Sequence, residues 1–424
     1  MTPDPVTGET TPRASDVVTL AEIEAAADRL SDVVHRTPLD SSTTIARRSG
    51  AARVELKLEN MQRTGSFKIR GAYNAMAQLP STVKDRGVVA SSAGNHAQGV
   101  ALAGKLLGID TKIVVPEITP AAKIEATRGY GADVVVEGEI YEDSYEYALD
   151  VADDEGREFV HPFDDENVIA GQGTVGLEII EDTPDVDTVV VSIGGGGLIS
   201  GIATAVKAFD PDVRVVGVQP KGAAHAKPSL EADEIRMLSD IDTVAEGIAD
   251  ARLLEQTFAV VRERVDDVVS VSDTDLAVAT TLLAERAKTV VETAGAAPVA
   301  ALLSGAIDVD GERVAAVVSG GNVNLTDHGE LTRLGLQHLG RYVDARLELD
   351  GWPTALGAVT EAVEEHGAEL DGVERVGRTA EGRPNRVPVE VGLEGSGPDH
   401  LGTVLDALDD VDGVSVVAHT LGGE

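Results

Sequence analysis

Lys68 is the residue of this sequence best suited to covalent chemistry. It lies in Ser66-Phe67-Lys68-Ile69-Arg70-Gly71-Ala72, between the apolar side chains of Phe67 and Ile69. A lysine with the ordinary pKa of about 10.4 is protonated at neutral pH, and it becomes nucleophilic only where desolvation or neighbouring charge lowers that value. The chain has only ten lysines, so one in an apolar setting is conspicuous. We therefore interpret Lys68 as a candidate for Schiff-base formation.

A first turn with small residues is Ser91-Ser92-Ala93-Gly94-Asn95-His96, which ends a predicted strand and begins an apolar helix. Backbone N–H groups at a helix N-terminus bind anions, which suits a substrate carboxylate. The amide of Asn95 can in addition donate to a ring hydroxyl. The competing interpretation is an ordinary helix cap made by Asn and Ser.

A second turn is Ser192-Ile193-Gly194-Gly195-Gly196-Gly197-Leu198, again between a strand and a helix. Four successive glycines allow the backbone to curl around a phosphate and to direct several N–H groups at it. No Gly-Lys-Ser/Thr follows, which excludes a P-loop. A dinucleotide site favours an acidic residue at the end of the next strand, and Gln219 stands there instead.

A third turn is Ser319-Gly320-Gly321-Asn322, after the strand 314–318. The hydroxyl of Ser319 is suited to face a heteroaromatic nitrogen, although a glycine-rich loop that merely closes a sheet fits equally well. Ligands of open α/β sheets bind at the carboxyl ends of strands, which is where all three turns lie.

The elements that must position these residues follow an alternating pattern. After an amphipathic helix at 18–34 and a strand at 54–58, short β-branched runs alternate with helices up to about Gly340, which is typical of parallel sheets covered on both faces. We expect two such sheets. The predicted strands are 87–90, 111–115, 132–136, 188–193, 213–218 and 314–319, and the predicted helices begin near Asn95, Thr119, Tyr141, Gly197 and Asp273.

A separate module is predicted after Gly340. Its pattern gives a strand at 341–350, a helix at 354–366, strands at 373–378 and 386–393, a helix at 398–410 and a last strand at 414–419. The order βαββαβ is the ferredoxin-like arrangement. No phosphate or metal motif lies in this module, so we expect it to bind or regulate.

Composition limits the class of protein. The net charge of −38, from 35 basic and 73 acidic residues, makes a nucleic-acid partner improbable, and no apolar run is long enough to span a bilayer. There is no cysteine, which excludes disulfides and thiolate metal sites. Acidic residues spread along the whole chain are typical of adaptation to high salt. We expect a cytoplasmic protein with a disordered tail at 1–16.

A lysine, a phosphate loop, an anion-binding helix start and a serine match the aldehyde, phosphate and ring of pyridoxal 5'-phosphate (PLP). On SFKIRGA, SSAGNHAQG, GGGGL and SGGN, in this order, the chain resembles the fold-type II PLP enzymes, and among them the threonine ammonia-lyases (threonine dehydratases). The resemblance implies a tryptophan synthase β-like α/β fold at 17–338, with a smaller cofactor subdomain at about 52–155, and an ACT-like regulatory domain at 339–424.

The resemblance also implies roles for single residues. Lys68 would hold the cofactor and remove the α-proton of the substrate, with Phe67 beside the ring, Asn95 on the ring hydroxyl and Ser319 at the pyridine nitrogen. The phosphate would be bound by Gly194, Gly195, Gly196, Gly197 and Leu198, and the substrate by Ser92, Ala93, Gly94, Asn95 and His96. Loss of the β-hydroxyl would convert threonine to 2-oxobutanoate and ammonia, as a first step of isoleucine biosynthesis.

Differences from related enzymes distinguish between the alternative activities of this family. Serine racemases have a serine as second base where this chain has Ala93, and they bind a divalent cation through an acidic residue where it has Gln219, so we expect no metal. Threonine synthases usually have an aspartate at the position of Ile69, and cysteine synthases usually lack the equivalent of His96. Serine dehydration stays open.

Two alternatives come from other classes of protein. A nicotinamide-dependent dehydrogenase is disfavoured by the lack of a clean G-x-G-x-x-G motif. A non-catalytic amino-acid sensor would leave Lys68 without a purpose. We also expect a homo-oligomer, a dimer or tetramer, and an amino-acid effector such as a branched-chain amino acid at the C-terminal module.

Overall fold

The structure, a computed structural model, describes residues 12–380 and 385–422. The chain divides into two compact units, residues 1–323 and 324–424. Most of the predicted disordered tail lies outside the described residues. The described end of that segment forms the short helix α1 (Ala14–Val17), in which Ala14 and Val17 are buried. Ordered structure therefore begins before residue 17, where the sequence analysis had placed the start of the fold.

The first unit contains a six-stranded sheet that is parallel except for the edge strand β1. Consecutive β-branched residues produce strands that are buried on both faces, as in the fully buried Thr188–Ser192. The order of the strands is β1 (Leu39–Ser41), β2 (Arg53–Leu58), β10 (Arg313–Val318), β7 (Thr188–Ser192), β8 (Arg214–Pro220) and β9 (Asp267–Val271).

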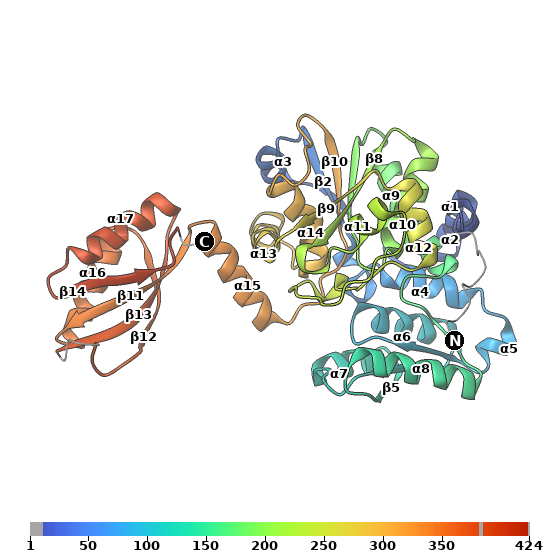
Figure 1. The fold of residues 1–424 in the computed structure, drawn as a ribbon, viewed down its shortest axis with the longest axis horizontal. Helices are drawn as coiled ribbons and strands as arrows, with labels where there is room; N and C mark the ends of the chain where they lie inside the picture. The colour runs from blue at the N-terminus through green and yellow to red at the C-terminus, as the bar shows by residue number, and fades with distance from the viewer. Residues whose placement is uncertain (1–11, 381–384, 423–424) are drawn as a thin grey trace, which may run out of the picture. The chain divides into compact units, whose positions relative to one another are not determined.

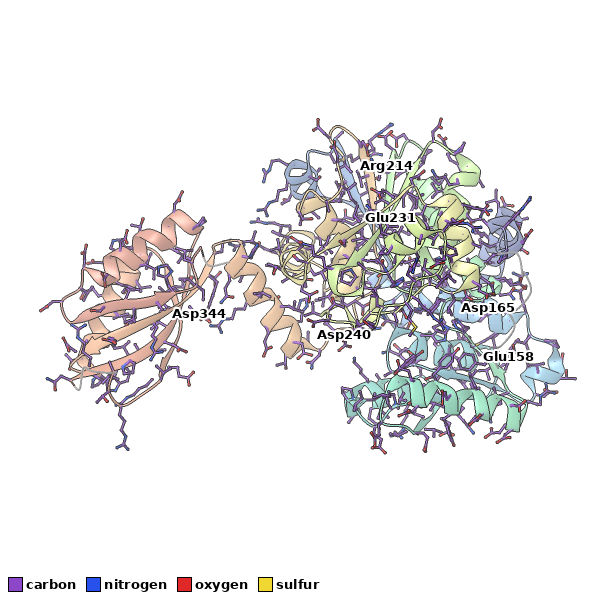
Figure 2. All side chains as sticks on the ribbon, in the orientation of Figure 1. Glu158, Asp165, Arg214, Glu231, Asp240 and Asp344 are labelled. Atoms are coloured by element: carbon purple, nitrogen blue, oxygen red, sulfur yellow. The ribbon has the colours of Figure 1, made fainter. Side chains whose placement is uncertain are left out.

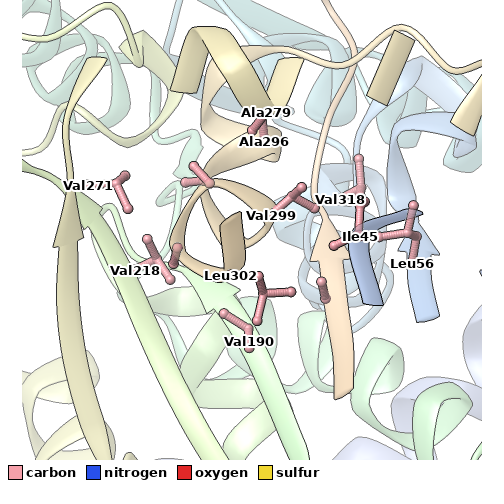
Figure 3. Packing of buried hydrophobic residues seen from close by; sticks show 14 of the residues in the cluster. Ile45, Leu56, Val190, Val218, Val271, Ala279, Ala296, Val299, Leu302 and Val318 are labelled. Carbon is pink, nitrogen blue, oxygen red and sulfur yellow. The ribbon is translucent and has the colours of Figure 1, made fainter. Parts of the chain in front are cut away.

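Helices cover both faces of this sheet (Figure 1). One face packs on α3 (Thr43–Ser49), α13 (Asp273–Leu282) and α14 (Thr293–Leu303), and the other on α9 (Glu166–Asp182), α10 (Gly197–Phe209) and α12 (Glu255–Arg264). Figure 3 shows Val299 and Leu302 of α14 against Val190, Val218 and Val318 of three strands. Burial of each such side chain contributes about 1.5–3 kcal/mol, so this core fixes where the strands end.

A second, wholly parallel sheet lies in the same unit, in the order β5-β4-β3-β6. Its strands are β3 (Val88–Ser91), β4 (Thr111–Val115), β5 (Asp133–Val136) and β6 (Glu158–Phe159). Helices α4 (Lys68–Ala77) and α6 (Asn95–Leu107) cover one face, and α8 (Tyr141–Glu155) covers the other. The two parallel sheets predicted from the sequence are thus confirmed.

Helix α4 is held between α6 and α9 by close backbone contacts. A Cβ added at Gly71 would lie 2.7 Å from the carbonyl oxygen of Val168 in α9, and one added at Gly99 in α6 would lie 3.0 Å from the carbonyl carbon of Lys68. Only glycine permits helices to approach so closely. Gly71, the glycine of SFKIRGA, therefore helps to set the position of Lys68.

Arg70 anchors α4 from within the protein. Its fully buried guanidinium donates to Glu59 at 2.7 and 2.8 Å and to Glu178 at 2.7 Å. Burial opposes ionisation of Glu59, but the charge and hydrogen bonds of Arg70 hold the pKa of this carboxyl below its ordinary value. A buried charge with its partners in place holds the first turn of α4 against its neighbours.

The second unit has the predicted βαββαβ order. After α15 (Leu325–His338), an antiparallel sheet of order β12-β13-β11-β14 packs on two helices. Its elements are β11 (Tyr342–Asp350), α16 (Thr354–Glu365), β12 (Glu369–Arg375), β13 (Arg386–Glu394), α17 (Pro398–Asp409) and β14 (Val414–His419). Part of the predicted turn between β12 and β13, residues 381–384, lies outside the described residues.

The sequence analysis missed three strands, β1, β6 and β9. β1 and β6 have only three and two residues, and β9 is half exposed. The edge strand β12, whose side chains are mostly exposed, was predicted but begins four residues earlier than expected. The remaining α-helices of the described residues are α2 (Leu20–Leu30), α5 (Ser81–Lys84), α7 (Ala121–Gly129) and α11 (Ala226–Ala232).

Figure 2 shows acidic side chains on several different elements, among them Glu158, Glu231 and Asp344. In the part of the chain that the structure describes, no helix has both the length and the apolar character needed to cross a membrane.

Candidate active site

Lys68 lies at the first position of α4, partly buried, where its side chain meets the end of β6. Its Nζ donates to the carbonyl oxygen of Pro162 at 2.8 Å and lies 5.4 Å from the centroid of the Phe67 ring. Burial lowers the pKa of Lys68 to about 8, although the charges of Asp250 and Glu292 oppose this change. An appreciable fraction of the amine is therefore unprotonated near neutral pH, as a nucleophile or base requires.

The glycine loop lies between β7 and α10, where no side chain fits. An added Cβ would lie 2.5 Å from a carboxylate oxygen of Asp250 at Gly194, 2.4 Å from the Phe163 ring at Gly195 and 2.8 Å from the Phe163 carbonyl oxygen at Gly197. Gly196 has a φ of +91°, which favours glycine. Leu198 follows in the first turn of α10, whose N-terminus attracts negative charge. The loop is thus a bare backbone cup for an anion such as phosphate.

Asp250 is a member of the site that the sequence analysis missed. Its carboxylate interacts with the backbone N–H of Gly195 and with the charge of Lys68. Burial raises the pKa of Asp250, while Lys68 and the Gly195 N–H counteract this effect. A phosphate in the cup would repel the ionised carboxylate, so anion binding favours a protonated or displaced Asp250.

Asn95 belongs to a chain of side-chain amides. Asn322 Nδ2 donates to the carbonyl oxygen of Thr64 and to Asn95 Oδ1, each at 2.6 Å, and Asn95 Nδ2 donates to Glu292 Oε1 at 2.7 Å. The carbonyl of Thr64 can only accept a hydrogen bond, so it fixes the orientation of the Asn322 amide. The Asn322 amide in turn fixes that of Asn95. Asn95 therefore keeps one N–H free to donate to a ligand.

Glu292 is a second carboxylate that the sequence analysis missed. Burial raises its pKa to about 7, whereas the hydrogen bond from Asn95 and the charges of Lys123 and Lys68 act in the other direction. A Cβ at Gly320 would approach Glu292 Oε1 to 2.1 Å, which explains why a glycine follows Ser319. The turn after β10 is thus shaped to admit this carboxylate.

Ser319 is buried where β10 ends, 3% exposed. Its carbonyl oxygen accepts the N–H of Phe67 at 3.3 Å, and Ser66 and Gly320 form an isolated antiparallel bridge. The third predicted turn therefore lies directly beside the segment that carries Lys68.

The first predicted turn caps α6. Ser92 Oγ accepts the N–H of Gly94 at 3.2 Å, and open space surrounds the position that a Cβ of Gly94 would occupy. Ala93 is partly buried against the core of the smaller sheet. His96 points away from this space, because its Nε2 is hydrogen-bonded to the Val160 carbonyl at 2.8 Å and burial lowers its pKa to about 3. The backbone of the turn is left to bind an anion.

The predicted residues converge from different strand ends, and unpredicted ones complete the site. Pro162, Asp250 and Glu292 lie in segments without a recognisable motif, although Glu292 could have been noticed as an acid directly before the largely apolar helix Thr293–Leu303. Among the described residues no cluster of three or more His, Asp or Glu is arranged to hold a metal ion. Fold and site together define an α/β enzyme with a lysine beside an anion cup.

Comparisons with known proteins agree with this class. A family model described as "Pyridoxal-phosphate dependent enzyme" matches residues 30–320. The chain is 46% identical over 354 residues to an L-threonine ammonia-lyase of Thermotoga maritima, which covers 84% of this chain and 88% of that one. It is 41% identical to an L-threonine ammonia-lyase of Geobacter sulfurreducens, over 92% of this chain and 96% of that one.

A solved structure of maize serine racemase superposes with a TM-score of 0.71 at 38% identity, over 76% of this chain and 99% of that one. The chain belongs to the family of pyridoxal-phosphate dependent enzymes. Its site fits the cofactor, because the bare glycine loop accommodates a phosphate and the lysine amine accommodates an aldehyde.

Proposed function

We propose that this chain is a threonine ammonia-lyase, which converts L-threonine to 2-oxobutanoate and ammonia. The observation that carries the proposal is the position of Lys68, a partly buried amine of lowered pKa between an anion cup and the N-terminus of α6. Relatives named L-threonine ammonia-lyase, 46 and 41% identical, support the choice of substrate.

The proposed roles follow the geometry. When bound, the cofactor supplies an electron sink for the Cα of the amino acid. Lys68 takes the α-proton, and the β-hydroxyl leaves as water after gaining a proton. Water then hydrolyses the released enamine, in its imine form, to the 2-oxo acid and ammonia, so one water is lost and one is gained. Burial of Lys68 lowers the pKa of its amine, which increases the fraction that can accept the proton at neutral pH.

The other site residues bind and orient. In this proposal Gly194 to Leu198 hold the phosphate, Phe67 packs beside the ring, Ser319 meets the pyridine nitrogen, and the free N–H of Asn95 donates to the ring hydroxyl. Ser92, Ala93, Gly94 and Asn95 surround the substrate carboxylate. His96 takes part through its backbone, because its ring is bonded to Val160.

Serine dehydration by the same residues is the second candidate, because the proposed chemistry requires only a β-hydroxyl. Racemisation is disfavoured, since Ala93, which stands at the position of the second base of serine racemases, carries no group that exchanges a proton. A nicotinamide-dependent dehydrogenase is disfavoured by Gln219, whose amide is bonded to His225 inside the protein.

Assay of the purified enzyme with PLP separates these activities. We expect 2-oxobutanoate and ammonia in equal amounts from L-threonine, a slower release of pyruvate from L-serine, and none of these products from Lys68→Ala. Formation of D-serine without a 2-oxo acid, or no turnover of either substrate, contradicts the proposal.

The C-terminal unit is proposed to be an ACT-like regulatory domain that binds a branched-chain amino acid. The antiparallel βαββαβ arrangement supports this proposal. Feedback by isoleucine would place the enzyme at the start of isoleucine biosynthesis. A cytoplasmic location and a homo-oligomeric state are part of the same proposal.

Adaptation to high salt is also proposed, on the net charge of −38. Because salt screens the mutual repulsion of surface carboxylates, the melting temperature should rise between 0.1 and 2 M KCl. A melting temperature that falls or stays constant over this range contradicts the proposal.

A further inference from the structure

Two polar side chains with no part in the proposed chemistry lie directly behind the glycine loop. Gln219 is the last but one residue of β8, and His225 precedes α11; both are fully buried. β8 pairs with β7, which leads into the loop through Ile193. Buried polar groups require partners, so the contacts of this pair reveal what they hold in place.

The amide of Gln219 has a fixed orientation. The backbone N–H of Ala226 donates to Oε1 at 2.8 Å, which identifies Nε2 as the donor end. Nε2 donates to the Ile193 carbonyl at 3.3 Å and lies 2.9 Å from His225 Nε2. An amide nitrogen has only hydrogens to offer, so His225 Nε2 must accept. The proton of the neutral imidazole therefore resides on Nδ1.

The Nδ1–H of His225 faces the first glycine of the loop. Among the described residues Nδ1 has no hydrogen-bond partner, and the backbone group that acts on the ring is that of Gly194. This interaction favours the protonated ring, so the carbonyl of Gly194, and not its N–H, is the group that faces the ring. Burial nevertheless lowers the pKa of His225 to about 4, so that the imidazole stays neutral at pH 7.

The orientation of the Gly194 carbonyl also determines where the N–H of Gly195 points. In a trans peptide the carbonyl of Gly194 and the N–H of Gly195 point in opposite directions. A carbonyl that faces His225 therefore turns the Gly195 N–H toward the cup, where it interacts with the carboxylate of Asp250. The interaction of His225 with the carbonyl and that of Asp250 with the N–H thus indicate the same orientation of the Gly194–Gly195 peptide.

We propose that Gln219 and His225 are positioning residues, which hold the Gly194–Gly195 peptide with the Gly195 N–H directed at the bound anion. Glycine adopts both signs of φ with similar ease, so this peptide has little intrinsic barrier to rotation. A flipped peptide would present a carbonyl oxygen to the phosphate and repel it. The inference rests on the proposed function, in which the loop binds the phosphate of PLP.

Three substitutions of His225 test the donor. The side-chain amide of His225→Asn can occupy the position of Nδ1–H, whereas His225→Gln extends toward the position of Nε2 and His225→Leu has no donor. We expect PLP affinity, from absorbance titration of the ligand-free protein, to fall less than threefold in His225→Asn and at least tenfold in the other two. Gln219→Leu removes the donor that fixes the tautomer of His225, so it should weaken PLP binding severalfold.

A role in packing alone makes the opposite prediction. In that case PLP affinity follows the melting temperature of the ligand-free variants, and His225→Leu binds as well as His225→Asn; either result overturns the proposal. Imidazole ¹⁵N NMR of the wild-type protein gives a check that needs no variant. The His225 ring should carry its proton on Nδ1, and an Nε2–H tautomer overturns the proposal.

Failure of the proposed function is distinguishable from failure of this inference. Wild-type protein that binds PLP but does not turn over threonine contradicts the function and leaves the positioning role intact. Wild-type activity that His225→Leu retains in full contradicts the positioning role alone.

Discussion

Asn95 Nδ2 donates to Glu292 Oε1 at 2.7 Å, across a separation of 197 residues in the sequence. This bond joins the N-terminus of α6, which covers the smaller sheet, to the start of α14, which covers the larger one. It also leaves the second N–H of Asn95 available as a donor. The orientation of the amide that faces the ligand is therefore set by a carboxylate that no motif contains.

The raised pKa of Glu292 predicts a stability that depends on pH. A carboxyl whose pKa is about 7 when folded and about 4.3 when unfolded contributes stability that is present below pH 4.3 and lost as the pH rises through 7. Glu292→Gln does not ionise. We expect the ligand-free variant to be more stable than wild type at pH 8, by about 1–3 kcal/mol, and this advantage to vanish at pH 4.5.

Urea unfolding at the two pH values measures this difference. Glu312→Gln is the matched control, because Glu312 is a carboxylate bonded to Thr188 and Arg214 outside the site. If Glu292→Gln changes the free energy of unfolding equally at both pH values, the pKa of Glu292 is not raised and the prediction is wrong.

Gly195→Ala should remove the phosphate site without unfolding the protein. The added methyl group would lie 2.4 Å from the Phe163 ring, so the ring or the loop must move. We expect PLP affinity to fall at least tenfold, as measured by absorbance titration. Gly129→Ala at the end of α7 is the control, because no neighbouring atom lies within 4 Å of its added Cβ. Equal PLP affinity of the two variants would contradict the assignment of the glycine loop as the phosphate site.

Arg70→Ala should destabilise the first unit strongly. Removal of the guanidinium leaves Glu59 buried and unpaired, which costs about 3–5 kcal/mol. The surface residue Arg36, paired with Glu181 and Asp182, offers a matched comparison, and Arg36→Ala should cost at most about 1 kcal/mol. Denaturant unfolding measures both, and similar losses in the two variants would refute a structural role for the buried network.

The strand ends of the site could be predicted because each is a β-branched run that stops at a glycine-bearing turn. The runs before Ser91, Ser192 and Ser319 supply their own hydrophobic signal, and the predicted starts of α6, α8, α10 and α13 coincide with those of the structure. The glycine loop could also be predicted from local sequence, because four adjacent glycines have few structural uses.

The remainder of the site arises from tertiary packing. Pro162 approaches Lys68 because β6, only two residues long, adds to the edge of the smaller sheet, and so short a strand has no periodicity. Asp250 reaches the cup from a loop without regular secondary structure. The hydrogen bond of His96 to Val160 likewise depends on β6, so the sequence alone could not show that the ring of His96 is engaged away from the substrate.

The regulatory proposal predicts that isoleucine lowers the activity of the full-length enzyme and raises its melting temperature. A chain that ends at Gly340, before β11, should keep its activity and lose both responses. Calorimetry and initial rates with 0–10 mM isoleucine or valine measure the responses. An effector that acts equally on the truncated chain would place its site in the catalytic unit.

Reduction of the holoenzyme with borohydride, followed by peptide mapping, tests the central claim most directly. Borohydride converts a Schiff base to a stable secondary amine, so the lysine that holds the cofactor keeps a phosphopyridoxyl group. The account predicts this label on Lys68, in the peptide that contains Ser66-Phe67-Lys68-Ile69, and its loss if L-threonine is added just before reduction. A label on another lysine, such as the buried Lys57, or no label on a protein that turns over threonine, would contradict it.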